Sequence, residues 1–268
     1  MNGALYNRAV IAISGGEARA FLQGLITNDV QALAPGKAIY AALLTPQGKI
    51  LFDFFVIERE ESLLLDCWAT AQQALLKRLL MYRLRAKLDI VSRDDLAVAW
   101  DRTSTLDDGF GDPRLSALGR RAIVGKAQFA DATATADAYL NCRLSLGIPE
   151  GADFGQDKMF ALDAGLEELN GVSFDKGCYV GQELTARMKH RGTARKRLLF
   201  IESADGAPLP MPDTPIRAGD RELGMLTSAY GSRGFALIRL DRLDESAGAE
   251  TETDGRSLRI VRPDWLAK

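Results

Sequence analysis

From Lys196 to its C-terminus, the chain is a series of short β-prone runs separated by Pro and Gly residues. The runs are RLLFIES, PIRA, ELGMLTSAY, GFALIRL and RSLRIVR, and none has a helical period longer than one or two turns. Short strands in close succession, with turn residues between them, are typical of antiparallel barrels. We therefore predict a C-terminal antiparallel β-barrel domain over residues 191–268.

Residues 1–190 alternate instead between strand-like and helix-like patterns. Two β-prone runs flank the hairpin signal Pro46-Gln47-Gly48, and a third run, SLLLDCW, follows closely. Apolar residues at helical spacing predict two helices, at 17–30 and 69–86, and a third that starts at 136 and is closed by Gly147 and Pro149. The Gly- and Asp-rich segment 103–121 predicts a loop. We expect an α+β fold, and 268 residues are enough for two or three packed units.

The composition is that of an ordinary globular protein, with 47% hydrophobic residues, 26% charged residues and a formal net charge of -2. The first residues lack the apolar core and cleavage site of a secretory signal, and no run approaches the ~18 apolar residues of a membrane span. The three cysteines are far apart and lack zinc-site spacing. We therefore expect a cytoplasmic protein with no resident metal and no membrane partner.

Cys178 is the cysteine whose surroundings suggest more than packing. The other two lie inside apolar runs, as buried free cysteines do. Cys178 lies in DKGCYVGQELTAR, where Gly177 and Gly181 remove neighbouring side chains and Lys176 adds a positive charge that favours the thiolate. A turn between two glycines can also be only a turn. The residues alone leave both interpretations open.

A dense basic run follows this cysteine. Six cations lie between Arg187 and Arg197, around the sole histidine, His190. Such a run is most often a solvated face, but Arg and Lys can also hold carboxylates or phosphates. Docking of RNA is weakened by the near-neutral net charge and by the lack of aromatic residues in the run.

Three polar residues, Thr27, Asn28 and Asp29, end the first predicted helix. Such residues cap helices and form turns, but Asn and Asp together can also bind the donor and acceptor edge of a heterocycle. The pattern does not separate these alternatives. The chain has no P-loop, dinucleotide-binding, zinc-protease or serine-hydrolase motif, so those functions lose their main support.

Six stretches, in the same order along nearly the whole chain, resemble one known family. They are FLQGLITNDV (21–30), TPQGKILFDF (45–54), YRLRAKLDI (82–90), LGIPEG (146–151), KGCYVGQE (176–183) and TARMKHRGTARKRL (185–198). The K-G-C-Y-x-G-Q-E block is highly specific. The sequence resembles the YgfZ branch of the GcvT-like folate-binding proteins, which includes the mitochondrial iron–sulfur assembly factors of the same architecture.

The resemblance implies two interleaved α+β subdomains and a C-terminal barrel around a central opening that binds tetrahydrofolate. It also implies a role in assembling or repairing iron–sulfur clusters, with clients such as the radical-dependent tRNA methylthiolase. In the related aminomethyltransferases an acid stands where this chain has Phe52, and only Asp53 remains, which argues against aminomethyl transfer. Their folate-reading glutamate aligns with Ser145, so Glu150 or Asp153 replaces it, or the pterin is oriented differently.

We therefore expect a tetrahydrofolate-binding protein in which Cys178 and Lys176 are catalytic. A folate-dependent aminomethyl- or methyltransferase and a basic RNA- or protein-docking module are the alternatives. The expected partners are folate and iron–sulfur client or assembly proteins, with nucleic acid reached only through client enzymes. The expected folate-binding residues are Asn28, Asp29, Asp53, Arg143, Glu150, Tyr179, Gln182, Glu183 and Arg187.

Overall fold

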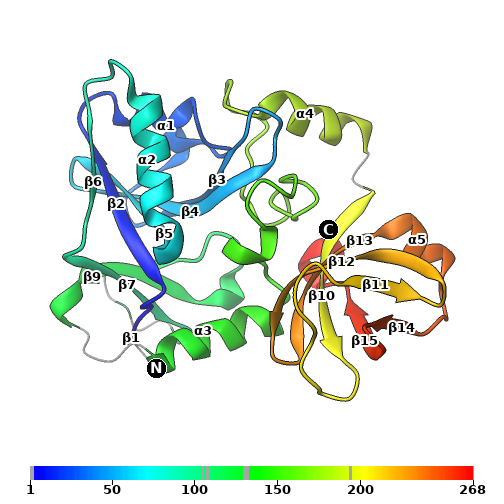
Figure 1. Cartoon of the computed structure of the whole chain (residues 1–268). Helices are drawn as coiled ribbons and strands as arrows, with labels where there is room; N and C mark the ends of the chain where they lie inside the picture. The colour runs from blue at the N-terminus through cyan, green and yellow to red at the C-terminus, as the bar shows by residue number, and fades with distance from the viewer. Residues whose placement is uncertain (1–2, 104–105, 107–108, 129–132, 193–194, 268) are drawn as a thin grey trace.

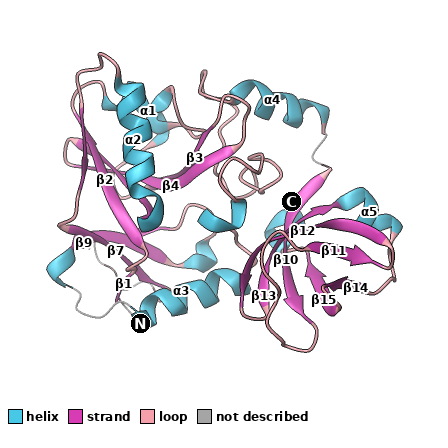
Figure 2. Ribbon diagram, viewed as in Figure 1, coloured by secondary structure: helices cyan, strands magenta, loops and turns pink. Residues whose placement is uncertain are grey.

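A computed structural model describes residues 3–103, 106, 109–128, 133–192 and 195–267, and in it two sheets are followed by a closed barrel (Figure 1). The helices lie on the sheets and at the edge of the barrel, as the colouring by secondary structure shows (Figure 2). Within the described residues, no helix is long and apolar enough to cross a membrane.

The first sheet has five antiparallel strands in the order β3-β4-β5-β2-β6. Their bounds are β2 (Arg8–Ser14), β3 (Ala38–Leu44), β4 (Ile50–Arg59), β5 (Ser62–Trp68) and β6 (Asp89–Ser92). One face packs against α1 (Ala18–Gln23) and α2 (Gln72–Arg83) through a core that includes Phe54 and Leu75. The other face carries Tyr40 and Phe55 into a second core. Strand β4 is therefore buried on both sides, which explains its nearly continuous apolar run.

The second sheet has the order β1-β7-β9-β8. Its elements are β1 (Gly3–Ala4), β7 (Leu96–Asp101), β8 (Phe110–Gly111) and β9 (Arg120–Gly125), and α3 (Thr133–Ser145) packs beside β1. The chain begins in this sheet, passes through the whole first sheet and then returns. The two subdomains are therefore interleaved, and the expected α+β class is confirmed.

The C-terminal part forms the predicted barrel, which is closed and antiparallel. Its elements are β10 (Lys196–Ser203), β11 (Pro215–Ala218), β12 (Arg221–Tyr230), β13 (Arg233–Arg239), α5 (Leu240–Glu245), β14 (Thr251–Thr253) and β15 (Arg256–Val261). Closure pairs β10 with both β13 and β15, so the barrel has no free edge there. The polar strand β14 was not predicted, because TET lacks an apolar alternation.

Several boundaries differ from the sequence predictions. Helix α1 ends at Gln23 rather than near Val30, because Asp29 caps a separate short helix, η1 (Val30–Ala32). Helix α2 ends at Arg83, since Leu84 leaves the helical backbone with φ 46°. The remaining helices are η2 (Ala69–Ala71), η3 (Ser116–Leu118), η4 (Lys126–Gln128), η5 (Gly151–Phe154), α4 (Gln182–Arg191) and η6 (Asp264–Ala267).

Two segments of the sequence predictions lie partly outside the described residues. They are 104–105 and 107–108 in the predicted loop 103–121, and 193–194 in the basic run. The rest of that predicted loop contains β8, η3, the first two residues of β9 and three buried charged residues, Asp112, Arg114 and Arg121. The basic run was not predicted to be helical, but its first part, up to Arg191, lies in α4, while Lys196 and Arg197 begin β10. The domain boundary expected between residues 190 and 191 falls in the last turn of this helix.

Candidate functional site

A pocket of about 270 Å³ lies where the first sheet, α2 and η5 meet. Its walls are mostly apolar and include Phe52, Trp68, Leu75 and Phe154, and Asp53 is the only carboxylic acid among its described lining residues. A concave, largely apolar surface with few polar groups is typical of a small-molecule site.

Two neutral donors hold the Asp53 carboxyl group in place. The Tyr40 hydroxyl donates to Oδ2 at 3.0 Å, and the Gly151 amide donates to Oδ1 at 3.0 Å. Burial raises the pKa of Asp53 to about 6, although the guanidinium groups of Arg8 and Arg114 oppose this. Asp53 therefore exchanges its proton near neutral pH, which suits a group that shares a proton with a ligand.

The indole of Trp68 packs directly on the backbone of Gly151 at the pocket wall. Gly151 has φ 55°, and a Cβ there would overlap the indole nitrogen of Trp68. That nitrogen is a buried donor without a hydrogen-bond partner among the described residues. A buried donor without a partner is costly, so a ligand acceptor in the pocket would satisfy it.

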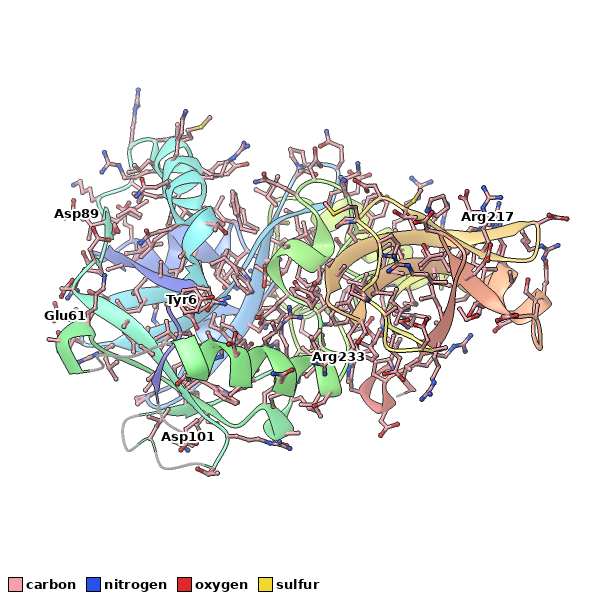
Figure 3. The ribbon with its side chains drawn as sticks, turned by 60° about the horizontal axis from the view of Figure 1, so that its bottom comes forward. Tyr6, Glu61, Asp89, Asp101, Arg217 and Arg233 are labelled. Carbon is pink, nitrogen blue, oxygen red and sulfur yellow. The ribbon has the colours of Figure 1, made fainter. Side chains whose placement is uncertain are left out.

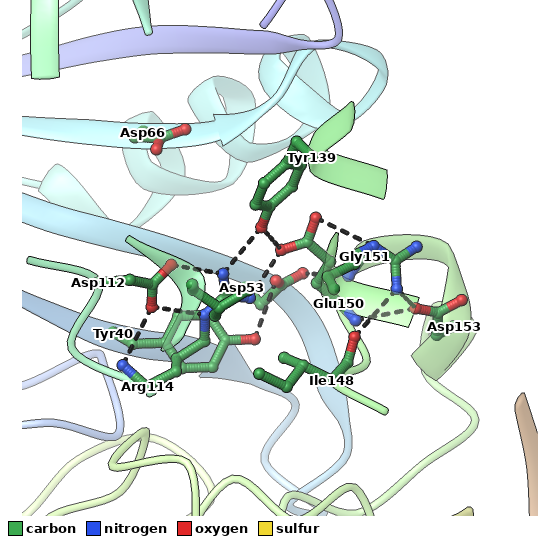
Figure 4. A network of polar contacts seen from close by, with 12 residues as sticks. Tyr40, Asp53, Asp66, Asp112, Arg114, Tyr139, Ile148, Glu150, Gly151 and Asp153 are labelled. Carbon is green, nitrogen blue, oxygen red and sulfur yellow. Dashed lines mark hydrogen bonds and ion pairs between the residues drawn. The ribbon is translucent and has the colours of Figure 1, made fainter. Parts of the chain in front are cut away.

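A balanced cluster of buried charges adjoins the pocket (Figure 4). Its four arginines and four carboxylates are Arg8, Arg114, Arg121, Arg143, Asp66, Asp112, Glu150 and Asp153. Glu150 accepts hydrogen bonds from Nη1 of Arg114 and from the hydroxyl of Tyr139, both at 2.7 Å. Burial alone would raise the pKa of Glu150, but Arg114 and Arg143 outweigh it and hold the pKa well below its usual range.

The same cluster shapes η5 and connects it to the barrel. Nη1 of Arg143 donates to Oδ2 of Asp153 at 2.7 Å, and the Glu150 amide donates to the same oxygen at 2.9 Å. From β12, the hydroxyl of Tyr230 donates to Oδ1 of Asp153 at 2.8 Å. The segment that lines the pocket is therefore fixed from both the α+β region and the barrel.

The loop with Cys178 lies against α1 and the turn that follows it. The ammonium of Lys176 donates to the backbone carbonyls of Gln23, Ile26 and Asn28 at 2.8, 2.7 and 2.8 Å. Its nitrogen lies 5.1 Å from the ring centroid of Tyr179, which is itself buried. The charge of Lys176 is thus directed into the protein, towards carbonyl oxygens at the end of α1.

Gly181 fixes the other end of this loop. A Cβ at Gly181 would lie 2.5 Å from the carbonyl oxygen of Thr45 and 3.2 Å from Cα of Gly48, and Gly181 has φ 84°. The loop therefore packs closely on the turn between β3 and β4, and only glycine fits there. At Gly177, by contrast, a Cβ would meet no atom within 4 Å.

Cys178 lies between these two anchors and is exposed, whereas the other two cysteines are buried. Burial raises the pKa of Cys67 to about 12 and also raises that of Cys142, so both are inert as nucleophiles. The arrangement presents one accessible thiol on a fixed loop. No cluster of three or more His, Cys, Asp or Glu residues in the described chain could hold a metal ion.

Asn28 and Asp29 use their side chains within the protein. The Asn28 amide nitrogen donates to the carbonyls of Tyr40 and Asn170, and Asp29 accepts from the backbone amide of Gln31. These contacts are those of turn and capping residues. Their predicted role in binding folate stays a prediction.

Helix α4 begins with Gln182 and carries Glu183 and Arg187, both exposed. The basic run is partly neutralised, because Lys189 pairs with Glu167 and Nη2 of Arg197 lies 2.9 Å from Oε1 of Glu168. The run is therefore less available to phosphates than its sequence suggests.

The structure divides the predicted site residues into two groups. Asp53, Arg143 and Glu150 belong to the pocket and its charge cluster. The other residues gather around the loop and α4: Asn28, Asp29, Lys176, Cys178, Tyr179, Gln182, Glu183 and Arg187. Sequence reasoning missed Trp68, Tyr40, Arg114 and Tyr139. No local motif marks these four residues.

Comparisons with known proteins agree with this architecture. Residues 7–100 match the family described as the GCVT N-terminal domain, and residues 195–268 match the CAF17 C-terminal beta-barrel domain. The mitochondrial iron–sulfur cluster assembly factor IBA57 of Mus musculus is 31% identical, with 97% of this chain and 84% of that protein covered. The Homo sapiens protein of the same name is 30% identical over the same shares.

A solved structure shows the same fold. The crystal structure of the glycine cleavage system aminomethyltransferase T from Bartonella henselae matches with a TM-score of 0.74. The alignment covers 98% of this chain and 85% of the aminomethyltransferase chain, at 16% sequence identity. Such a likeness establishes the fold and no more.

The prediction of a cytoplasmic location is wrong by these comparisons, because the IBA57 relatives are mitochondrial proteins. The lack of a secretory signal pattern and of a membrane span does not distinguish the cytoplasm from the interior of an organelle. A reducing environment is not unique to the cytoplasm, so the cysteine content could not make that distinction.

Proposed function

This chain belongs to the GcvT-like family of the iron–sulfur cluster assembly factor IBA57. From this membership we propose that it assembles or repairs iron–sulfur clusters in client enzymes, with a reduced folate as cofactor and Cys178 as the working thiol. Clients include enzymes of tRNA modification.

The observation that carries the proposal is the geometry of the loop 176–181. Lys176 and Gly181 fix its two ends, Tyr179 is buried, and the thiol of Cys178 alone is left open to a partner. Holding a reactive group on a rigid support is how a protein reduces the entropic cost of a transfer step. One cysteine cannot complete the coordination of a cluster, so the remaining ligands come from a partner protein or a small thiol.

The Asp53 pocket has the features that a reduced pterin requires. Its volume lies just below the ~300–1,000 Å³ of drug-sized sites, which suits one fused ring system, with the tail of the folate outside. The carboxyl group of Asp53 and the unpartnered indole N–H of Trp68 offer an acceptor and a donor to the ring edge. The bound folate would supply one-carbon chemistry, while these residues orient it.

The pocket and the loop of Cys178 both adjoin the β3–β4 hairpin. Gly181 packs on the turn at Gly48, and the pocket lining begins at Ile50 on β4. Cys178 is exposed and is not among the described residues that line the pocket, which favours a thiol that works with a partner protein over one that reacts with the pterin. The folate then acts as a bound effector or carrier near the same face.

The alternative functions have less support. Transfer of an aminomethyl group requires the acid that Phe52 replaces, and Phe52 belongs to the apolar core beside α1 and α2. Docking of RNA on the basic run requires free cations there, and the ion pairs of Lys189 and Arg197 remove two of the six.

Two experiments test the proposal separately. A strain that lacks its own factor is given this chain, and a cluster-dependent tRNA methylthiolation is assayed. Restored methylthiolation supports the assembly role, and no restoration from well-expressed protein contradicts it. Tetrahydrofolate is titrated against tryptophan fluorescence and by calorimetry, with Trp68→Phe identifying the reporting side chain. No saturable binding by calorimetry would remove the cofactor and leave the assembly role to be judged by the first assay.

A further inference from the structure

The free end of α2 and the turn after it carry an unusual concentration of exposed apolar side chains. Of seven large hydrophobic residues that are exposed in the described chain, three lie between residues 80 and 84. They are Leu80, Met81 and Leu84, with exposed fractions of 42%, 61% and 86%. We call these three residues and the cations near them in the sequence the α2 tip patch. Single exposed hydrophobic residues are common, but a cluster indicates a contact surface.

Backbone strain holds the most exposed of these side chains outward. Leu84 has φ 46° and ψ -107°, and the Ala86 amide donates to the Arg83 carbonyl at 2.8 Å. This is the first central position of a type II′ turn, where glycine is the ordinary residue. A leucine in this conformation costs stability without gaining a buried contact. Strain of this kind is retained where the side chain has another use.

The patch is strongly basic. Residues 77–91 contain five cations and one acid, which gives a net charge of +4 (5 − 1). The cations are Lys77, Arg78, Arg83, Arg85 and Lys87. None of the five forms an ion pair with another described residue. Their charge is therefore available to an anionic partner.

The shape of the patch favours a lipid surface over a protein groove. Helix α2 and its following turn stand at an outer edge of the molecule, away from the barrel and α4 (Figure 1). Side chains at this end project from the ribbon near Asp89, while the labelled Arg217 lies far away on the barrel (Figure 3). The exposed apolar members are aliphatic, without the Trp or Tyr anchors that dominate protein interfaces. Protruding aliphatic residues within a ring of cations are the features of peripheral membrane contacts.

We propose that the α2 tip patch docks the protein on an anionic lipid surface, with Leu84 and Met81 inserted among the headgroups and the cations on lipid phosphates. The absence of a membrane-spanning segment led us to expect no membrane partner. That absence does not bear on contact with a membrane surface. The proposal is independent of folate and of the thiol.

Flotation with lipid vesicles tests the proposal directly. Wild-type protein should float with vesicles of phosphatidylcholine mixed with phosphatidylglycerol, remain free with phosphatidylcholine alone, and be released by added NaCl. Leu84→Gly should bind at least about tenfold more weakly, because it loses the inserted side chain. The same variant relieves the strained turn, so unfolding cannot explain its loss. Arg85→Ala should weaken binding about fivefold.

The barrel offers matched controls, since Met211 is 79% exposed and Arg217 is an exposed cation far from α2. Met211→Ser and Arg217→Ala should bind vesicles as well as the wild type does. Absence of wild-type binding to the anionic vesicles at low salt would overturn the proposal. Equal losses in the barrel variants would also overturn it, because binding would then be general charge attraction. If Leu84→Gly loses function in cells although the wild-type protein binds no vesicles, the occupant is a protein and the lipid proposal is wrong.

Discussion

The ammonium of Lys176 lies 2.8 Å from the carbonyl oxygen of Asn28, a residue 148 positions earlier in the chain. Two further carbonyls, of Gln23 and Ile26, accept from the same nitrogen, so one cation satisfies three acceptors at the end of α1. The lysine therefore positions the loop of Cys178 on the N-terminal sheet region. A catalytic role for Lys176 stays a prediction, and the positioning role can be tested on its own.

Replacing Lys176 by methionine preserves the length of the side chain and removes all three hydrogen bonds. We expect the free energy of unfolding to fall by about 2–4 kcal/mol, because a hydrogen bond to a charged group contributes about 1.5–3 kcal/mol and water replaces part of the loss. Urea denaturation measures the change. The control is Lys189→Met, which removes an exposed ion pair and should cost less than about 1 kcal/mol. Equal losses in the two variants would contradict the positioning role.

Replacement by alanine should lower the stability of the protein at Gly181 and leave it nearly unchanged at Gly177. Gly181→Ala forces a Cβ onto the Thr45 carbonyl at a positive φ, and we expect a loss of about 2–4 kcal/mol. Gly177→Ala places its Cβ in open space and should remain within about 0.5 kcal/mol of the wild type. Thermal unfolding of the pair measures the difference. If both variants were equally stable, the close packing of the loop on the β3–β4 turn would be wrong.

Asp53 should make stability depend on pH. Because its pKa is raised on folding, from 3.8 to about 6, its contribution is fully present below about pH 4 and is lost as the pH rises through 6. Asp53→Asn removes this loss, and both contacts can remain, because the amide oxygen accepts from the Gly151 amide and the amide nitrogen donates to the Tyr40 hydroxyl oxygen. The stability of the variant relative to the wild type should therefore increase by up to about 3 kcal/mol between pH 4 and pH 7.

Denaturation at several pH values measures this difference. Burial also raises the pKa of Asp163 to about 6, but that residue is common to both proteins and cancels. A difference that is independent of pH would contradict the shifted pKa. The same variant should bind tetrahydrofolate at least about tenfold more weakly if the carboxyl group holds the pterin.

Glu150→Gln tests the buried charge cluster. The substitution removes one charge from a balanced set and leaves Arg114 with an incomplete partner, so we expect a loss of about 3–5 kcal/mol. Glu183→Gln, on the exposed face of α4, is the matched control and should change stability by less than about 0.5 kcal/mol. Chemical denaturation of both variants and of the wild type measures the two changes in the free energy of unfolding. A tolerated Glu150→Gln would mean that the cluster is dispensable for folding.

Local patterns predicted the parts of this molecule that depend on local physics. The barrel follows from five runs separated by turn residues, and the β3–β4 hairpin follows from Pro46-Gln47-Gly48. The buried charges could not be predicted in this way, because Arg121 pairs with Asp66 across 55 residues and Arg114 lies in a segment that reads as loop. A short sequence window contains only one member of the Arg121–Asp66 pair and only one member of the Arg114–Glu150 pair.

The sequence predicted some residues of the candidate site and missed others. The exposed thiol of Cys178 agrees with the glycines beside it, but the engagement of Lys176 by three carbonyls reverses the direction in which its charge was expected to act. Trp68 gave no signal, since it is the last residue of an apolar strand, β5, and belongs to no motif. Its place in the pocket depends on Gly151, which is distant in the chain.

The rescue of a cluster-dependent tRNA methylthiolation by Cys178→Ala, compared with Gly177→Ala, tests the central claim most directly. Both substitutions lie in the same loop, and Gly177→Ala leaves the thiol in place with no steric conflict. In a strain that lacks its own factor, Gly177→Ala should restore methylthiolation to the wild-type level. Cys178→Ala should fail although the protein is equally abundant and stable. Full rescue by Cys178→Ala would show that the exposed thiol takes no part in the function.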